Sequence, residues 1–224
     1  MAHYEIEIKT LLGALERAEA LKERMKLLDP LCTLTSQNRQ LNHYFEGGDV
    51  SVLVAACRNL FDAEAQEKLD LMVSKGKNFS VRTREKDEEV LLVLKASIDE
   101  GSSENGVSRL EFEEKVPLTL AELDQKVLDA GFVYQAKWSR EREEYSYKNC
   151  NVCIDRNAGY GYLAEFEKIV ENESAAQDAR EELALLMDEL EVWELSQERL
   201  GRMFQFYNQN WPEYYGTDKV FVIE

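Results

Sequence analysis

Charged residues recur at every second position in several segments of this sequence. The repeated pairs are the glutamates Glu5/Glu7, Glu111/Glu113 and Glu165/Glu167 and the arginines Arg82/Arg84 and Arg140/Arg142. Carboxylate oxygens are the ligands that hard divalent cations prefer. Arginine guanidinium groups bind phosphate through paired hydrogen bonds. A site that combined both kinds of pair would suit a polyphosphate bound together with a metal ion.

Strands are the elements that would position these pairs, because successive side chains of a strand point to opposite faces. In the opening segment "HYEIEIK", the charged Glu5, Glu7 and Lys9 share one face, and Ile6 and Ile8 share the other. The same alternation predicts eight strands, at residues 1–11, 32–46, 77–86, 88–97, 106–116, 132–148, 150–157 and 161–170. Most are joined by short turns, which favours an antiparallel sheet that eight strands can close into a barrel.

The remaining segments predict helices. Apolar residues at helical spacing indicate helices at 14–28 and 119–130, and further helices near the C-terminus at about 174–208. Residues 47–79, between two of the strands, also read as helical. The chain has 224 residues, 3 prolines and no linker rich in proline, glycine or serine, so we expect a single domain spanning 1–224.

The charged strand faces allow two arrangements. If they point to solvent, the apolar faces form the core of an ordinary barrel. If they point inward, the barrel has a polar lumen, and helices cover the apolar outer faces. Buried charges cost several kcal/mol each unless they are paired or bound to a ligand. Alternation by itself leaves both arrangements open.

Bulk properties exclude several classes of function. The net charge of −17 argues against general binding to nucleic acid or to a membrane surface, since both carry negative charge. The sequence has no apolar run of about 18 residues and no signal-peptide pattern, so we expect a cytoplasmic protein. Its four cysteines then read as reduced thiols. Cys150 and Cys153 form a lone CxxC with no second pair, which favours plain strand residues over a zinc or redox site.

The motifs, taken in order, resemble the CYTH family, the triphosphate tunnel metalloenzymes. The segments that carry the resemblance are "EIEIK", "NHYFE", "SVRTRE", "LVLKAS", "SRLEFEEKV", "SRERE" and "CIDRNAGYGYLAEFEKI". They extend from about Tyr4 to Ile169. The resemblance implies an α+β fold in which a closed eight-stranded antiparallel β-barrel forms a tunnel with a charged lumen, flanked by helices. Residues 47–79 depart from the family, as an insertion that either caps a tunnel mouth and selects substrate or is an inert surface helix.

The resemblance also implies roles for residues. The triphosphate would be bound by Lys9, Arg82, Arg84, Lys95, Arg109, Arg140 and Arg142. A Mg²⁺ or Mn²⁺ ion would be held by carboxylates from Glu5, Glu7, Glu111, Glu113, Asp155, Glu165 and Glu167. Glu5, Glu7 and Lys9, the ExExK motif, would be the catalytic residues. The implied partner is a small-molecule triphosphate, and a homodimer is also compatible with the family.

The implied reaction is metal-dependent hydrolysis of inorganic triphosphate, thiamine triphosphate or a nucleoside triphosphate. The first alternative is a class IV-type adenylyl cyclase, which would bind the phosphate groups in the same way but convert ATP to cyclic AMP and pyrophosphate. The cyclase members carry a His-Phe pair at a different spacing from His3-Tyr4, which favours hydrolysis. Further alternatives are a non-catalytic polyphosphate- or nucleotide-binding module, which the many carboxylates disfavour, and a plain barrel without a site.

Overall fold

The structure, a computed structural model, describes residues 4–97, 109–171 and 173–223. The side chains of Glu5 and Arg109, two of the candidate site residues, lie outside the part that is described. The described strands are β1 (Tyr4–Gly13), β2 (Thr33–Gly47), β3 (Lys77–Lys86), β4 (Glu89–Ser97), β5 (Arg109–Lys115), β6 (Phe132–Tyr147), β7 (Cys150–Asn157) and β8 (Gly161–Val170). The described α-helices are α1 (Leu15–Leu28), α2 (Val50–Cys57), α3 (Ala63–Lys75), α4 (Leu120–Asp129), α5 (Ala176–Glu189) and α6 (Gln197–Tyr214).

The strands form one antiparallel sheet in the order β1-β8-β7-β6-β2-β3-β4-β5. The predicted α+β class and the eight antiparallel strands are therefore confirmed. Among the described residues, hydrogen bonds do not join the end strands β1 and β5, so closure into a barrel is not confirmed. The chain divides into two compact units, Met1–Arg39 with Ser139–Glu224, and Gln40–Trp138.

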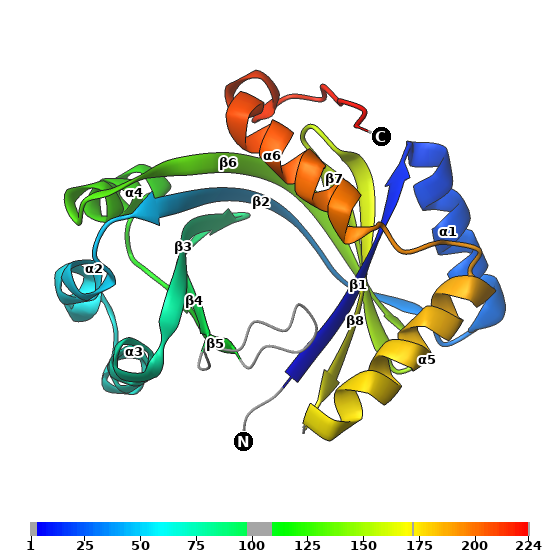
Figure 1. Cartoon of the computed structure of the whole chain (residues 1–224), viewed down its shortest axis with the longest axis horizontal. Coiled ribbons are helices and arrows are strands. Elements are labelled where there is room, and N and C mark those ends of the chain that lie inside the picture. The colour runs from blue at the N-terminus through cyan, green and yellow to red at the C-terminus, as the bar shows by residue number, and fades with distance from the viewer. Residues whose placement is uncertain (1–3, 98–108, 172, 224) are drawn as a thin grey trace. The chain divides into compact units, whose positions relative to one another are not determined.

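In the first unit, helices α1 and α5 cover one face of the sheet formed by β1, β8, β7 and β6 (Figure 1). Ile6 and Ile8 of β1 and Phe166 of β8 are buried in a core with Met25 of α1 and Leu183 of α5. The alternate residues of the same strands, including the charged ones, therefore lie on the face opposite these helices.

In the second unit, α2, α3 and α4 pack against the sheet formed by β3, β4 and β5 (Figure 1). Val81, Leu94 and Phe112 of these strands are buried with Leu69 of α3 and Leu123 of α4. Here too the charged residues of the strands alternate with the buried ones. Helices therefore cover the apolar strand faces in both units, which is the arrangement that the inward alternative requires.

The predicted insertion at 47–79 contains two helices, α2 and α3, and a short 3-10 helix (Arg58–Leu60). Asp49 and Asp62 cap the two helices by accepting hydrogen bonds from the backbone N–H groups of Ser51 and Ala65. Their apolar residues belong to the core of the second unit. The insertion is thus a structural part of that unit.

The first unit also includes a C-terminal segment that follows α6. The backbone of Gly159, in the turn between β7 and β8, forms hydrogen bonds with Lys219 and Phe221. Tyr160, Tyr207 and Phe221 pack their rings together at this point. Through the described ranges, none of the helices combines the length and the apolar character needed to cross a membrane.

Candidate functional site

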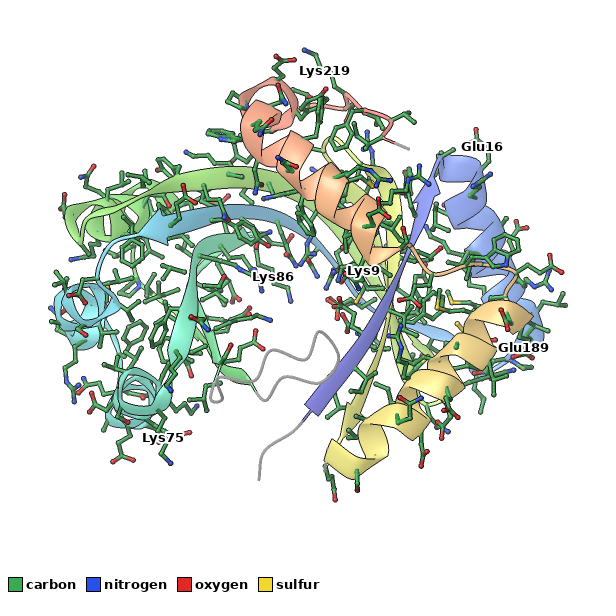
Figure 2. The ribbon with its side chains drawn as sticks, in the orientation of Figure 1. Lys9, Glu16, Lys75, Lys86, Glu189 and Lys219 are labelled. Carbon is green, nitrogen blue, oxygen red and sulfur yellow. The ribbon has the colours of Figure 1, made fainter. Side chains whose placement is uncertain are left out.

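Strand register in the first unit places the predicted charged residues opposite one another. Lys9 of β1 faces Glu165 of β8, and Glu7 faces Glu167. On the next pair of strands, Arg142 of β6 faces Asp155 of β7. Figure 2 shows Lys9 on β1, on the side away from α1 and α5. We call this set, with Arg140, the first charged face.

Arg142 is the centre of the hydrogen bonding on the first charged face. Its guanidinium donates to both oxygens of Asp155, each at 2.7 Å, and also to Glu165. Arg140 donates to Asp155 at 3.0 Å. Lys9 forms ion pairs with Glu7 and, at 3.2 Å, with Glu165. Asp155, whose side chain is only 1% exposed, thus accepts hydrogen bonds from both arginines and holds them in place.

The charges on this face are stabilised by one another. Burial alone would raise the pKa of Glu165, but Lys9 and Arg142 outweigh burial and lower that pKa to about 2. Burial acts to lower the pKa of Arg142, and the hydrogen bonds and charge of Asp155 outweigh it and raise that pKa. Both groups are therefore ionised at neutral pH.

Glu165 and Glu167 form the part of this face best suited to a metal ion. One ligand atom each from Glu165, Glu167 and Cys153 lies within 4.8 Å of the others. Two carboxylates fit a hard divalent cation such as Mg²⁺ or Mn²⁺. Burial strongly raises the pKa of the Cys153 thiol, so it is protonated and a poor ligand for such an ion. Asn151 donates to Glu167 at 2.8 Å and orients it.

The CxxC motif does not form a site. Because Cys150 and Cys153 are three positions apart along a strand, their side chains point to opposite faces. Cys150 is buried in the core beneath α1 and α5, and Cys153 lies beside Glu167. All four cysteines are buried free thiols, as the sequence led us to expect.

The second unit has a charged face of its own, on β2, β3, β4 and β5. Arg84 of β3 donates to Asn42 of β2 at 2.7 Å, and to both oxygens of Glu113 of β5 at 2.7 and 2.8 Å. Lys95 of β4 pairs with Glu111 at 2.8 Å. We call Arg82, Arg84, Lys95, Glu111 and Glu113 the second charged face.

Arg82 differs from the other basic residues of this face. Its guanidinium carbon lies 4.4 Å from the centre of the Tyr44 ring, and its Nε donates to Ser80 at 3.3 Å. Among the described residues, no carboxylate pairs with it. A half-buried arginine held against an aromatic ring, without an acidic partner, can bind an anion without first breaking an ion pair.

The structure thus groups the predicted residues into two sets. Lys9, Glu7, Arg140, Arg142, Asp155, Glu165 and Glu167 lie on the first charged face. The other described residues, Arg82, Arg84, Lys95, Glu111 and Glu113, lie on the second. For Glu5 and Arg109 only the strand register is described, opposite Ile169 and Ser97.

Sequence reasoning missed the uncharged partners Asn42 and Asn151 and the contact of Tyr44 with Arg82. Asn42 and Tyr44 occur in the "NHYFE" motif, two residues apart and thus on one strand face, which is the available signal. Asn151 lies two and four residues before Cys153 and Asp155 on β7, on their face of the strand.

Comparison with known proteins identifies the fold. A conserved hypothetical protein of Pyrococcus furiosus aligns with a TM-score of 0.57 and 18% identity, over 87% of this chain and 93% of that one. The PH1819 protein of Pyrococcus horikoshii aligns with a TM-score of 0.56 and 20% identity, over 87% and 94%. A protein of Vibrio parahaemolyticus, provisionally assigned as an adenylate cyclase, aligns with a TM-score of 0.57 and 14% identity, over 90% and 99%.

No curated protein matches the chain by sequence. A sequence model of the CYTH domain matches residues 3–200, which include both charged faces. These residues also contain all seven motifs on which the resemblance rests. The chain therefore belongs to the CYTH family.

Proposed function

We propose that this protein hydrolyses a small-molecule triphosphate with the help of Mg²⁺ or Mn²⁺. One observation carries the proposal: in both units, arginines and carboxylates lie together on the strand face opposite the one packed against α1 and α5, or against α2, α3 and α4. If these faces were simply exposed to solvent, the side chains of Arg142, Asp155 and Glu165 would not be as deeply buried as they are. Family membership supports the same chemistry.

The basic residues would bind the phosphate groups. A triphosphate carries about four negative charges, and several preorganised cations stabilise both the substrate and the charge that develops during phosphoryl transfer. Arg82 has no described carboxylate partner and would bind first. Arg84 and Lys95 would exchange Glu113 and Glu111 for phosphate oxygens.

The carboxylates would serve two purposes. Asp155 keeps Arg140 and Arg142 oriented. Glu165 and Glu167, with Glu7 opposite Glu167, are the residues that would hold the metal ion. When bound, such an ion polarises phosphoryl oxygens and orients a water molecule. Lys9 pairs with both Glu7 and Glu165 and would hold these two carboxylates close together.

The proposed role of the basic residues in phosphate binding can be tested on each charged face separately. Arg84→Gln, from the second face, and Arg140→Gln, from the first, should then each raise KM for the triphosphate at least tenfold, since each removes a charge-assisted contact worth about 1.5–3 kcal/mol. A variant with an unchanged KM would show that its charged face does not bind the substrate.

Product identification tests the proposed reaction. The purified chain is incubated with inorganic triphosphate, thiamine triphosphate or ATP, with Mg²⁺, Mn²⁺ or EDTA, and orthophosphate, pyrophosphate and cyclic AMP are measured in the same samples. We expect metal-dependent release of orthophosphate. Cyclic AMP with pyrophosphate from ATP would show a cyclase instead, and triphosphate binding without any product would show a binding module.

Metal binding can be measured without turnover. The electron paramagnetic resonance signal of free Mn²⁺ is titrated with the wild-type chain, with Glu165→Gln/Glu167→Gln and with the control Glu181→Gln/Glu182→Gln on α5. We expect the first double variant to lose most Mn²⁺ binding and the control to retain it. Equal binding by all three proteins would rule out Glu165 and Glu167 as ligands.

A further inference from the structure

A second set of polar residues lies on the opposite side of the sheet from the second charged face. Asp124 of α4 is 4% exposed and accepts three hydrogen bonds. His43 Nδ1 of β2 lies 2.7 Å from its Oδ2, Tyr134 Oη of β6 donates to Oδ2 at 2.6 Å, and Thr83 Oγ1 of β3 donates to Oδ1 at 2.5 Å. We call these four residues the Asp124 cluster.

The position of Asp124 in the sequence is unusual for a carboxylate. With Leu120, Leu123 and Val127 it forms the buried stripe of α4, at the spacing of a helix face that packs on a core. Burial raises the pKa of Asp124, but the hydrogen bonds from His43, Thr83 and Tyr134 outweigh it and lower that pKa. An ionised carboxylate can only accept, so Nδ1 of His43 carries a proton.

The strand register connects this cluster to the arginines. His43 and Thr83 lie directly opposite each other on β2 and β3, and Asp124 bridges them. Because side chains alternate, the residues on either side of Thr83 are Arg82 and Arg84 of the second charged face. The residues on either side of His43 are Asn42 and Tyr44.

Those four neighbours are already in contact in pairs. Asn42 accepts from Nε of Arg84 at 2.7 Å, and Tyr44 lies under the guanidinium of Arg82. The register of β2 against β3 therefore determines whether each arginine meets its partner. A buried and fully satisfied polar network favours one such register over its alternatives.

We propose that Asp124 is a positioning residue: by holding His43 and Thr83 from the helix side, it fixes Arg82 and Arg84 against Tyr44 and Asn42 in the places from which they bind phosphate. The final step rests on the proposed function, since it assumes that these arginines bind triphosphate. The structural step, from the cluster to the placement of the arginines, does not.

Thr83→Val is the main test, because it replaces the hydroxyl with a methyl group and keeps the shape of the side chain and its preference for strands. Thr83→Ser restores a hydroxyl and serves as the rescue. Val81→Ala is the matched control, since Val81 is buried on the same face of the same strand and belongs to no polar cluster. Asp124→Asn adds a variant that keeps the size of the carboxylate and removes its charge.

Two measurements are made on each folded variant. The first is KM and kcat for inorganic triphosphate. The second is the rate at which the Arg84 Nε–H exchanges with solvent, measured by NMR on protein labelled with ¹⁵N-arginine. We expect Thr83→Val to raise KM five- to tenfold with kcat within twofold, and to speed the exchange about tenfold. Asp124→Asn should change both in the same direction, and Thr83→Ser should restore both.

The outcomes separate the two proposals. If Thr83→Val matched Val81→Ala in both KM and exchange rate, the cluster would be a structural feature of the core, and the positioning role would be wrong. If the wild-type chain neither bound nor hydrolysed triphosphate, the proposed function would be wrong. In that case the exchange of the Arg84 Nε–H would still decide whether the cluster places the arginine.

Discussion

At the scale of single residues, the first charged face is an assembly of mutually dependent charges. Arg142 bonds to Asp155 and to Glu165, and Lys9 bonds to Glu165 from the other side. Each carboxylate is stable in a buried place because a cation is beside it. The removal of one member should therefore affect the others, which leads to two predictions.

The first prediction concerns Arg142 and Arg140. Arg142→Met should lower the free energy of unfolding by about 3 kcal/mol, because it leaves Asp155 and Glu165 each short of a cation in a buried place. Arg140→Met should cost about 1 kcal/mol, because Asp155 keeps both bonds from Arg142. Urea unfolding at neutral pH measures both values. Equal losses of unfolding free energy in the two variants would show that Arg142 is not the centre of the hydrogen bonding on this face.

The second prediction concerns the dependence of stability on pH. Glu165 has a pKa of about 2 in the folded chain, below its ordinary value of 4.5. Between these values the unfolded chain binds a proton that the folded chain does not, so stability falls as the pH falls. This contribution, on the order of 3 kcal/mol at neutral pH, is fully present above about pH 4.5 and lost through about pH 2.

Glu165→Gln should flatten that acid dependence, as measured by urea unfolding at several values of pH from 6 down to about 2. Glu182→Gln, which removes an exposed glutamate that pairs with Lys168 on the surface, is the control and should keep the wild-type slope. If the Glu165→Gln variant kept the wild-type slope as well, the depressed pKa would be wrong.

At the scale of elements, alternation of polar and apolar residues was enough to locate the sheet. The predicted strands at 77–86, 150–157 and 161–170 match β3, β7 and β8 as observed. These strands are bounded by turn residues, such as Asp87 and Asn149, that adopt positive φ.

Tertiary packing explains where the prediction fell short. The sequence led us to expect the last helix to end near residue 208, but α6 continues to Tyr214 and includes Pro212. Its last turns are held by ring contacts between Tyr214 and Phe221 of the following segment. Likewise, the Asp124 cluster depends on the register of β2 against β3, which alternation within one strand cannot supply.

The turn between β7 and β8 carries the third prediction. Gly159 has φ +83°, and a Cβ there would lie 2.8 Å from atoms of Phe221 and Tyr207. Gly159→Ala should therefore cost about 2–3 kcal/mol of stability, the sum of backbone strain and lost packing.

Gly216→Ala is the matched control, because Gly216 has φ +70° and open space around it, so only the strain of about 1 kcal/mol applies. Thermal unfolding of both variants measures the difference, and equal losses would show that the C-terminal segment does not pack on this turn.

At the scale of the whole molecule, the sequence predicted which residue types occupy the two charged faces, but it did not establish whether the strands close into a barrel around them. The net charge of −17 would suggest a protein that repels phosphate, yet the strand faces opposite α1 and α5, and opposite α2, α3 and α4, carry lysines and arginines among their carboxylates. The ordered motifs predicted the family, which the CYTH match confirms. Closure of the eight strands into a tunnel stays a prediction, because it depends on the two ends of the sheet and not on any single strand.

Release of orthophosphate from inorganic triphosphate is the most direct test of the proposed hydrolysis. It compares the wild-type chain, Arg84→Gln and the control Arg58→Gln, in which the lost arginine is exposed and paired with Asp70. We predict metal-dependent release by the wild type and the control, and a kcat/KM at least about 100-fold lower for Arg84→Gln, equivalent to about 2.7 kcal/mol of transition-state stabilisation. Release that persists in EDTA, equal rates for the two variants, or no release by the wild type would contradict the account.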